Sequence, residues 1–128
     1  MKKLLILSVF ISGCFVTPCN AQSLSYYSGP SDPYQDMDAF HSITNKNVDV
    51  SLETGCTTYH GNFEGSLGGA AYSLTTSGGS IFNEGISSVW NYLLYDSYQI
   101  TINNVSGTLM FVVWGAYGGW GTASAVVY

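Results

Sequence analysis

The residues of this sequence best suited to chemistry are aromatic. Tyr, Trp and Phe make up 15% of the chain, and tyrosine alone occurs 10 times. Flat rings stack on the apolar C–H faces of sugars while short polar groups bind the hydroxyls, and neither contact needs a positive charge. Strand-rich cores and interfaces also use aromatic side chains. We take two clusters as candidate glycan-binding residues: Tyr26, Tyr27 and Ser28, and Trp114, Tyr117 and Trp120.

A nucleophilic active site has little support in the sequence. Cys56 and His60 are four residues apart and would lie on the same side of a strand. No third member and no oxyanion donor can be placed beside them, and this spacing is common by chance. The alternative is a core cysteine and a surface histidine. We therefore expect a protein that is not an enzyme and has no catalytic residue.

The acidic residues allow two further site types, and neither has a specific motif. Asp32, Asp36 and Asp38 lie close together, but the glycine and distal glutamate of a calcium-binding EF-hand loop are missing. We expect a solvated acidic loop there, with no metal and no cofactor. Carboxylate pairs for glycoside hydrolysis can be drawn from a second set, as in any acidic domain: Glu53, Glu64, Glu84 and Asp96.

The charge balance excludes several classes of partner. The chain has 3 basic and 8 acidic side chains, a net charge of −5. Without Lys2 and Lys3 the net charge is −7, and Lys46 is the one basic residue left. No Lys or Arg cluster exists to displace counterions from phosphates, so we expect no nucleic-acid partner. Anionic lipid surfaces are excluded on the same ground.

The first 21 residues read as a signal peptide. Lys2 and Lys3 form a positive end, and an apolar run follows from Leu4 to Phe10. We predict cleavage after Ala21 and a secreted or periplasmic protein. The alternative is processing as a lipoprotein, with the domain anchored through Cys14. No other apolar stretch approaches the ~20 residues that cross a bilayer, so no membrane span is expected.

Residues 22–128 are long enough for a single domain that folds alone. Cys14 and Cys19 leave with the signal peptide, so only Cys56 remains and no internal disulfide is possible. Cys56 is then either buried as a small apolar side chain or paired between molecules. We interpret residues 22–42 as an irregular N-terminal arm, because Gly29 to Pro33 is rich in turn residues.

The rest of the domain reads mainly as strands. Residues 48–53 alternate apolar and polar side chains, and residues 57–63 and 70–76 are further candidate strands. Residues 98–103 and 109–114 suggest a hairpin with a turn at 104–107, and residues 123–128 suggest a last strand.

One segment favours a helix. Ile86, Val89, Trp90, Leu93 and Leu94 fall at helical spacing, with Asn83 and Glu84 placed to cap the start. A strand remains the alternative reading. The expected fold is α+β or mainly β: a small Greek-key, oligosaccharide-binding (OB)-like barrel, or a sheet with one short helix across it.

Four features of the sequence together resemble those of a known protein family. They are the signal peptide, Tyr26-Tyr27-Ser28, the strand before Cys56, and the run ISSVWNYLLYDSYQITI from Ile86 to Ile102. The chain resembles the binding (B) subunits of ring-forming bacterial toxins of the subtilase, typhoid and pertussis-like families. The resemblance implies an OB barrel, a pentamer with helices lining a pore, binding of cell-surface glycans, and a separate toxic enzymatic subunit as partner.

The leading hypothesis is therefore a secreted subunit that binds a cell-surface glycan or glycoprotein receptor and forms a homo-oligomer. A pilin-like or adhesive surface protein, whose edge strands pair with neighbours, is one alternative. A periplasmic inhibitor or immunity protein is another.

Overall fold

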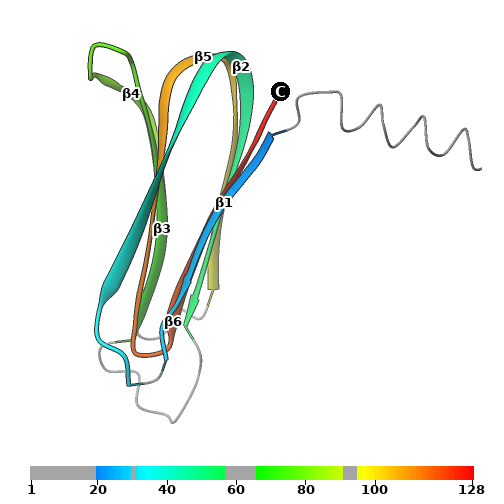
Figure 1. The fold of residues 1–128 in the computed structure, drawn as a ribbon. Helices are drawn as coiled ribbons and strands as arrows, with labels where there is room; N and C mark the ends of the chain where they lie inside the picture. Colours follow the sequence, from blue (N-terminus) through cyan, green and yellow to red (C-terminus); the bar gives the residue numbers. More distant parts are fainter. Residues whose placement is uncertain (1–19, 30, 57–65, 91–94) are drawn as a thin grey trace, which may run out of the picture.

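The protein is an all-antiparallel β structure. The computed structural model describes residues 20–29, 31–56, 66–90 and 95–128, and it contains no helix among them. Within these ranges, six strands pair in the order β1-β6-β2-β5-β3-β4 (Figure 1). Their bounds are β1 Asn20–Tyr27, β2 Gln35–Cys56, β3 Leu67–Thr75, β4 Ile81–Trp90, β5 Tyr95–Ala116 and β6 Gly119–Val127.

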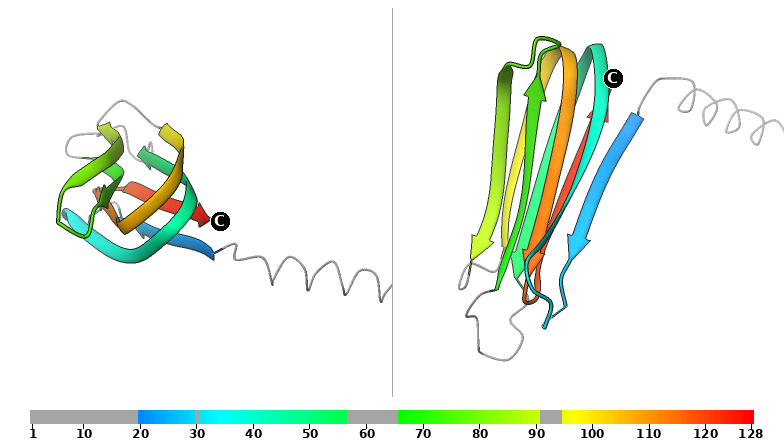
Figure 2. Two further views of the ribbon diagram at one scale, coloured as in Figure 1. Left: turned by 90° about the horizontal axis from the view of Figure 1, so that it is seen from above. Right: turned by 60° about the vertical axis from the view of Figure 1, so that its left-hand side comes forward.

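The two longest strands fold the sheet into two layers. β2 and β5 each have 22 residues, and both bend over at the same end of the molecule (Figures 1 and 2). Residues 48–55 of β2 pair with 95–102 of β5, whereas residues 35–43 pair with 107–115. Layer A thus has the order β1, β6, second half of β2, first half of β5. Layer B has the order first half of β2, second half of β5, β3, β4.

This connectivity is a jelly roll, the arrangement that two Greek keys make when they are wrapped into a double sheet. From above, the strands enclose a common centre (Figure 2). The mainly β class is therefore confirmed, whereas the small OB-like barrel that was predicted is not what the described residues form: they form a two-layer sandwich.

Asparagines build the bend between the layers. Asn45 and Asn104 have φ of 50° and 54° in the left-handed region, which asparagine adopts more easily than other non-glycine residues. The amide N–H of Asn45 donates to Ser106 Oγ at 3.0 Å, and that of Asn104 donates to Asn47 Oδ1 at 3.0 Å. These bonds satisfy backbone groups where the β2–β5 register shifts between Ile43 and Val48.

The core lies between the layers and follows a period of two along each strand. Burying each large apolar side chain stabilises the folded state by about 1.5–3 kcal/mol. The buried members include Val48, Val50, Leu52, Ala123 and Ala125 from layer A, and Ala70, Tyr72, Leu74, Leu109, Phe111 and Val113 from layer B.

Glycines bring the two layers into direct contact at the end opposite the bend. A Cβ on Gly119 would lie 1.5 Å from the Leu67 carbonyl oxygen, and one on Gly121 would lie 1.8 Å from the Gly69 carbonyl oxygen. Only glycine permits such an approach of backbone to backbone. The chain crosses between the layers beside this contact, through the turn at Tyr117 and Gly118, whose φ values are 49° and 90°.

The predicted helix is wrong. Its described part belongs to β4, which pairs with β3 from Trp90↔Leu67 to Ile81↔Thr75. Ser87 and Val89 are buried, whereas Ile86 and Trp90 point outward and are 60% and 69% exposed. The apolar residues that suggested one helical stripe therefore lie on opposite faces of a strand. Leu93 and Leu94 lie outside the described residues.

Two further predictions are wrong in part. The supposed arm at 22–42 contains β1 and the first part of β2, because Leu24 and Tyr26 alternate with serines along β1. The supposed hairpin at 98–114 is the single bent strand β5, whose two halves both pair with β2. Asn104 and Gly107 turn the chain there, but between layers.

Other strand predictions are confirmed in β2, in β3 and, for most of 123–128, in β6. The predicted strand at 57–63 and nearly all of the signal peptide lie outside the described residues. None of the described residues belongs to a helix that is long and apolar enough to cross a bilayer.

Candidate functional site

Three aromatic side chains form one row across the outer face of layer A. Tyr27 of β1 is the register partner of Trp120 of β6, Trp120 is the partner of Gly55 of β2, and Gly55 is the partner of Tyr95 of β5. Residues directly opposite each other in antiparallel strands project to the same face. We call Tyr27, Trp120 and Tyr95 the aromatic row.

The glycine in the row allows the central ring to lie flat. A Cβ on Gly55 would fall 2.5 Å from both Cε2 and Nε1 of Trp120, so the indole covers the Gly55 backbone. The indole extends toward Tyr95, and the two ring centroids are 6.4 Å apart with an interplanar angle of 48°. Tyr27 and Tyr95 are 61% and 53% exposed. The row is thus an accessible platform.

Short polar side chains continue the same face beside the row. The next set of register partners is Ser25, Thr122, Glu53 and Ser97, and the set after it is Ser23, Ser124, Ser51 and Gln99. The Thr122 hydroxyl donates to Ser25 Oγ at 3.2 Å. Farther along the face a shallow hollow of about 420 Å³ includes Asp49, Gln99 and Thr101. The face offers hydroxyl, amide and carboxylate groups.

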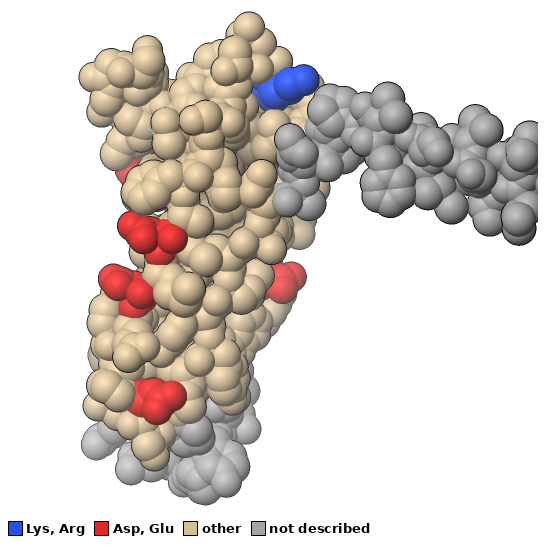
Figure 3. All heavy atoms as spheres, in the orientation of Figure 1, with Lys and Arg blue, Asp and Glu red and all other residues tan. Residues whose placement is uncertain are grey.

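The described part of the protein carries little positive charge anywhere. Lys46 is the one basic residue among the described residues, and it lies at the bend, at the end opposite the aromatic row. In Figure 3 the basic side chain is seen at the upper end, whereas acidic side chains are spread along the body. The outer face of layer A therefore cannot form ion pairs with anionic groups beside the row.

The structure brings two of the six predicted glycan-binding residues together, Tyr27 and Trp120. Tyr26 projects to the opposite side of β1, and its hydroxyl donates to Gln35 Oε1 at 3.1 Å. Ser28 is fully buried and donates to the Gly119 carbonyl oxygen at 2.7 Å, while accepting from the Gly118 amide at 3.0 Å. Ser28 therefore holds the β5–β6 turn in place.

The other two predicted residues lie elsewhere. Trp114 is on the outer face of layer B, where its ring covers Gly69 as Trp120 covers Gly55. Tyr117 is in the turn between β5 and β6 and is partly exposed. Sequence reasoning missed Tyr95 and Gly55, because nothing in the sequence indicates that Gly55 would lie between Trp120 and Tyr95.

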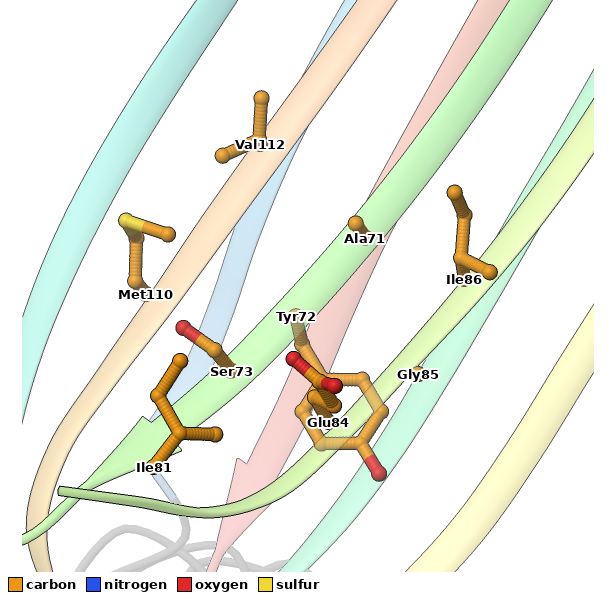
Figure 4. A pocket seen from close by; sticks show the side chains of 9 residues that line it. All are labelled: Ala71, Tyr72, Ser73, Ile81, Glu84, Gly85, Ile86, Met110 and Val112. Atoms are coloured by element: carbon orange, nitrogen blue, oxygen red, sulfur yellow. The ribbon is translucent and has the colours of Figure 1, made fainter.

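A second surface lies on the outer face of layer B. A hollow of about 540 Å³ there is lined mainly by apolar side chains, with Glu84 and Ser73 as its polar groups (Figure 4). Ile81, Ile86, Met110 and Val112 surround it, and Phe40 and Trp90 are exposed on the same face. This surface is apolar where the outer face of layer A is polar.

The described residues that were considered for enzymatic chemistry do not lie together in one site. Cys56 is buried, and burial raises the pKa of its thiol, partly offset by a hydrogen bond with Ser66. Glu53 and Glu84 lie on the outer faces of different layers, and Asp96 accepts a hydrogen bond from Ser87 at 2.9 Å. His60 and Glu64 lie outside the described residues.

The acidic residues near the start of β2 have structural roles. Asp32 Oδ2 accepts from the Gly29 amide at 2.7 Å, and Asp36 accepts from the Tyr34 hydroxyl at 3.2 Å. Within the described ranges, no three His, Cys, Asp or Glu side chains are grouped so that they could hold a metal ion.

No protein-family model and no curated protein matches the sequence. Among solved structures, the enzymatic domain of tailspike protein 4 of bacteriophage CBA120 is similar, with a TM-score of 0.48, 7% identity and coverage of 84% of this chain and 18% of that one. A pilus subunit of Bacillus endospore appendages has a TM-score of 0.38 and 8% identity over 84% of both chains. The carbohydrate-binding module CBM4 has a TM-score of 0.39 and 8% identity over 89% of this chain and 79% of that one.

These similarities do not assign a function, because the identities and TM-scores are low and one fold supports many functions. The chain spans less than a fifth of the length of the tailspike chain.

Proposed function

We propose that this protein is an exported glycan-binding protein and that the aromatic row is its binding platform. The observation that carries the proposal is the alignment of Tyr27, Trp120 and Tyr95 on one exposed sheet face, beside two rows of hydroxyl and carboxylate side chains. Aromatic rings with adjacent hydrogen-bonding groups match the two kinds of surface that a sugar presents.

The row is held rigidly enough to bind without large reorganisation. All three rings project from strands, and Trp120 rests on the Gly55 backbone. A platform on paired strands loses less side-chain entropy on binding than residues of a flexible loop would. The exposure of Tyr27 and Tyr95 leaves their faces open to a ligand.

Screening a glycan array with the secreted protein tests the proposal, using two matched tryptophan variants. Trp120→Ala should reduce binding at least about tenfold, equivalent to ~1.4 kcal/mol. Trp114→Ala removes the other glycine-covering indole, on the outer face of layer B, and should leave glycan binding unchanged. Equal binding by wild type and a folded Trp120→Ala protein would refute the proposal.

Export is part of the same proposal. It is supported by the charged and apolar start of the sequence. Mass spectrometry of the protein from cell-free culture medium and periplasm should give a chain that begins at Gln22. An acylated chain that begins at Cys14 would favour the lipoprotein alternative.

A second candidate function is assembly with further copies of this chain through the outer face of layer B. The two edge strands of this layer expose large apolar side chains there, Phe40 at 61% from β2 and Ile86 at 60% from β4. Contiguous apolar patches of this kind mark interaction sites more often than scattered apolar residues do. Acidic residues on the same face, Asp36, Asp38 and Glu84, oppose self-association, so association should strengthen as salt screens their charges.

Sedimentation at low and high salt tests this candidate, with Ile86→Glu as the variant that should dissociate the assembly. A closed ring, as the toxin-subunit resemblance implies, gives one discrete oligomer. A fibre subunit gives a ladder of masses, and a monomer at all salt concentrations would contradict assembly. The ring hypothesis also includes a toxic enzymatic partner, and co-purification with such an enzyme would support that hypothesis.

A further inference from the structure

We infer that the aromatic row binds a single neutral polysaccharide chain that lies across the strands of layer A and twists from one sugar to the next. This inference rests on the proposed function and specifies its ligand. It excludes two other modes of glycan binding, a pocket for one terminal sugar and the flat surface of a crystalline polysaccharide.

The length of the row favours a chain over a single sugar. Tyr27, Trp120, Gly55 and Tyr95 lie on four successive strands, so the row spans three strand separations, ~14 Å. Tyr27 lies on β1 and Tyr95 on the first half of β5, the two edge strands of layer A. The row therefore runs from edge to edge of its layer, and a bound chain can continue beyond either ring.

The orientation of the rings favours a twisted chain over a flat surface. Trp120 and Tyr95 are separated by two strand steps, and neighbouring strands twist by roughly 20–25° each. The planes of the Trp120 and Tyr95 rings are themselves inclined by 48°, so the two rings do not form one coplanar surface. A crystalline face presents coplanar sugars and cannot stack on both rings, whereas one flexible chain can follow the rotation.

The neighbouring polar row explains how such a chain would be recognised. Ser25, Thr122, Glu53 and Ser97 run parallel to the aromatic row at a distance of two residues along each strand, ~6.7 Å. They can therefore contact one edge of a chain stacked on the rings. The Glu53 carboxylate accepts hydrogen bonds from sugar hydroxyls.

The charged residues near the aromatic row indicate that the bound polysaccharide is neutral. Glu53 would repel the carboxylates of uronic or sialic acids. Lys46 is nine residues from Gly55 along β2, so it lies on the order of 20 Å or more from the row, beyond the ~8 Å screening length at physiological salt.

Calorimetric titration of the secreted protein with defined oligosaccharides tests the inference. The probes are the cello- and malto-oligosaccharide series from one to six sugars, the strongest neutral ligand from the glycan array, trigalacturonate, and crystalline cellulose. For at least one neutral series, affinity should rise at least tenfold from the monosaccharide to the trisaccharide and then level off. Trigalacturonate and crystalline cellulose should not bind.

A variant at the end of the row adds a positional test. Tyr95→Ala should lower the affinity for the hexasaccharide about tenfold and lower the affinity for the monosaccharide much less, because a single sugar can stack on either remaining ring whereas a long chain contacts all three. Thermal melting of Tyr95→Ala confirms that the variant is folded.

The outcomes separate the inference from the proposed function. Equal affinity for the monosaccharide and hexasaccharide of a bound glycan, binding of trigalacturonate, or preference for crystalline cellulose would overturn the inference while glycan binding stands. The absence of binding to every glycan on the array would overturn both.

Discussion

The indole of Trp120 lies over the backbone of Gly55, close enough that a methyl group on Gly55 would come within 2.5 Å of two ring atoms. The two residues are register partners on neighbouring strands, and they form the centre of the aromatic row. The glycine thus determines how the ring is presented.

Gly55→Ala should disrupt the binding platform. The new Cβ displaces the Trp120 ring, because real Cβ contacts do not approach that closely. The displaced ring then moves away from Tyr95. We expect glycan affinity to fall about tenfold or more, equivalent to ~1.4 kcal/mol. Calorimetry with the array's strongest ligand measures the effect.

Two other glycines provide controls for that variant. Gly69→Ala places a Cβ 2.0 Å from the Trp114 ring on layer B, so it makes the same kind of clash away from the aromatic row. Gly78→Ala meets only Thr76 Oγ1 at 3.8 Å. Both should retain glycan binding, and an equal loss of affinity in Gly69→Ala would show that the Gly55 effect is general destabilisation.

Gly121→Ala should destabilise the fold strongly. Its Cβ would lie 1.8 Å from the Gly69 carbonyl oxygen, and a backbone atom cannot move aside as a flexible side chain can. Overpacking of this kind lowers the free energy of unfolding by about 1–3 kcal/mol. Urea unfolding followed by far-UV circular dichroism should show a lower midpoint than in Gly78→Ala. An unchanged midpoint would mean that the layers are farther apart than described.

The unfolding free energy should decrease at alkaline pH. Burial raises the pKa of Tyr72, and the neighbouring Tyr98 raises it further. Above about pH 10, the ordinary tyrosine pKa, the unfolded chain therefore releases this proton before the native protein does. The unfolded state then binds fewer protons, so stability is complete below pH 10 and is lost as the pH rises.

Urea titrations between about pH 9 and pH 11 measure this slope. Tyr72→Phe removes the ionisable group and should make the slope shallower, while losing the hydrogen bond to Asn83 at every pH. The same slope in both proteins would exclude Tyr72 as its source.

Cys56 should be unreactive in the native protein. The thiol is buried, and burial raises its pKa, so little nucleophilic thiolate is present near neutral pH. In the protein that begins at Gln22, iodoacetamide should modify Cys56 slowly in buffer and rapidly in urea. A disulfide-linked dimer on a non-reducing gel would instead favour pairing between molecules.

The sequence predicted the class of structure where local alternation was clear. Val48, Val50 and Leu52 alternate with polar residues because one face of β2 packs in the core, and that signal needs no tertiary information. β4 lacks this alternation signal, because Gly85, Ser87 and Val89 lie on its inward face whereas the large apolar residues Ile86 and Trp90 point outward. Ser87 is tolerated inside because it hydrogen-bonds to Thr54 and Asp96.

The candidate site was predictable in kind but not in arrangement. Aromatic composition and the lack of basic residues pointed to Tyr27 and Trp120, yet their pairing depends on the register between β1 and β6, which are far apart in sequence. Tyr95 joins them only because the first half of β5 pairs with the second half of β2, which places Tyr95 opposite Gly55. Long-range register of this type leaves no local signal.

The indole N–H resonances of the three tryptophans test the central claim most directly. Trp120 lies in the aromatic row on layer A, whereas Trp90 and Trp114 lie on the outer face of layer B. In a titration of the ¹⁵N-labelled protein with its neutral oligosaccharide, the Trp120 indole signal should shift and the other two should not. A shift confined to Trp90 or Trp114, with Trp120 unmoved, would contradict the account.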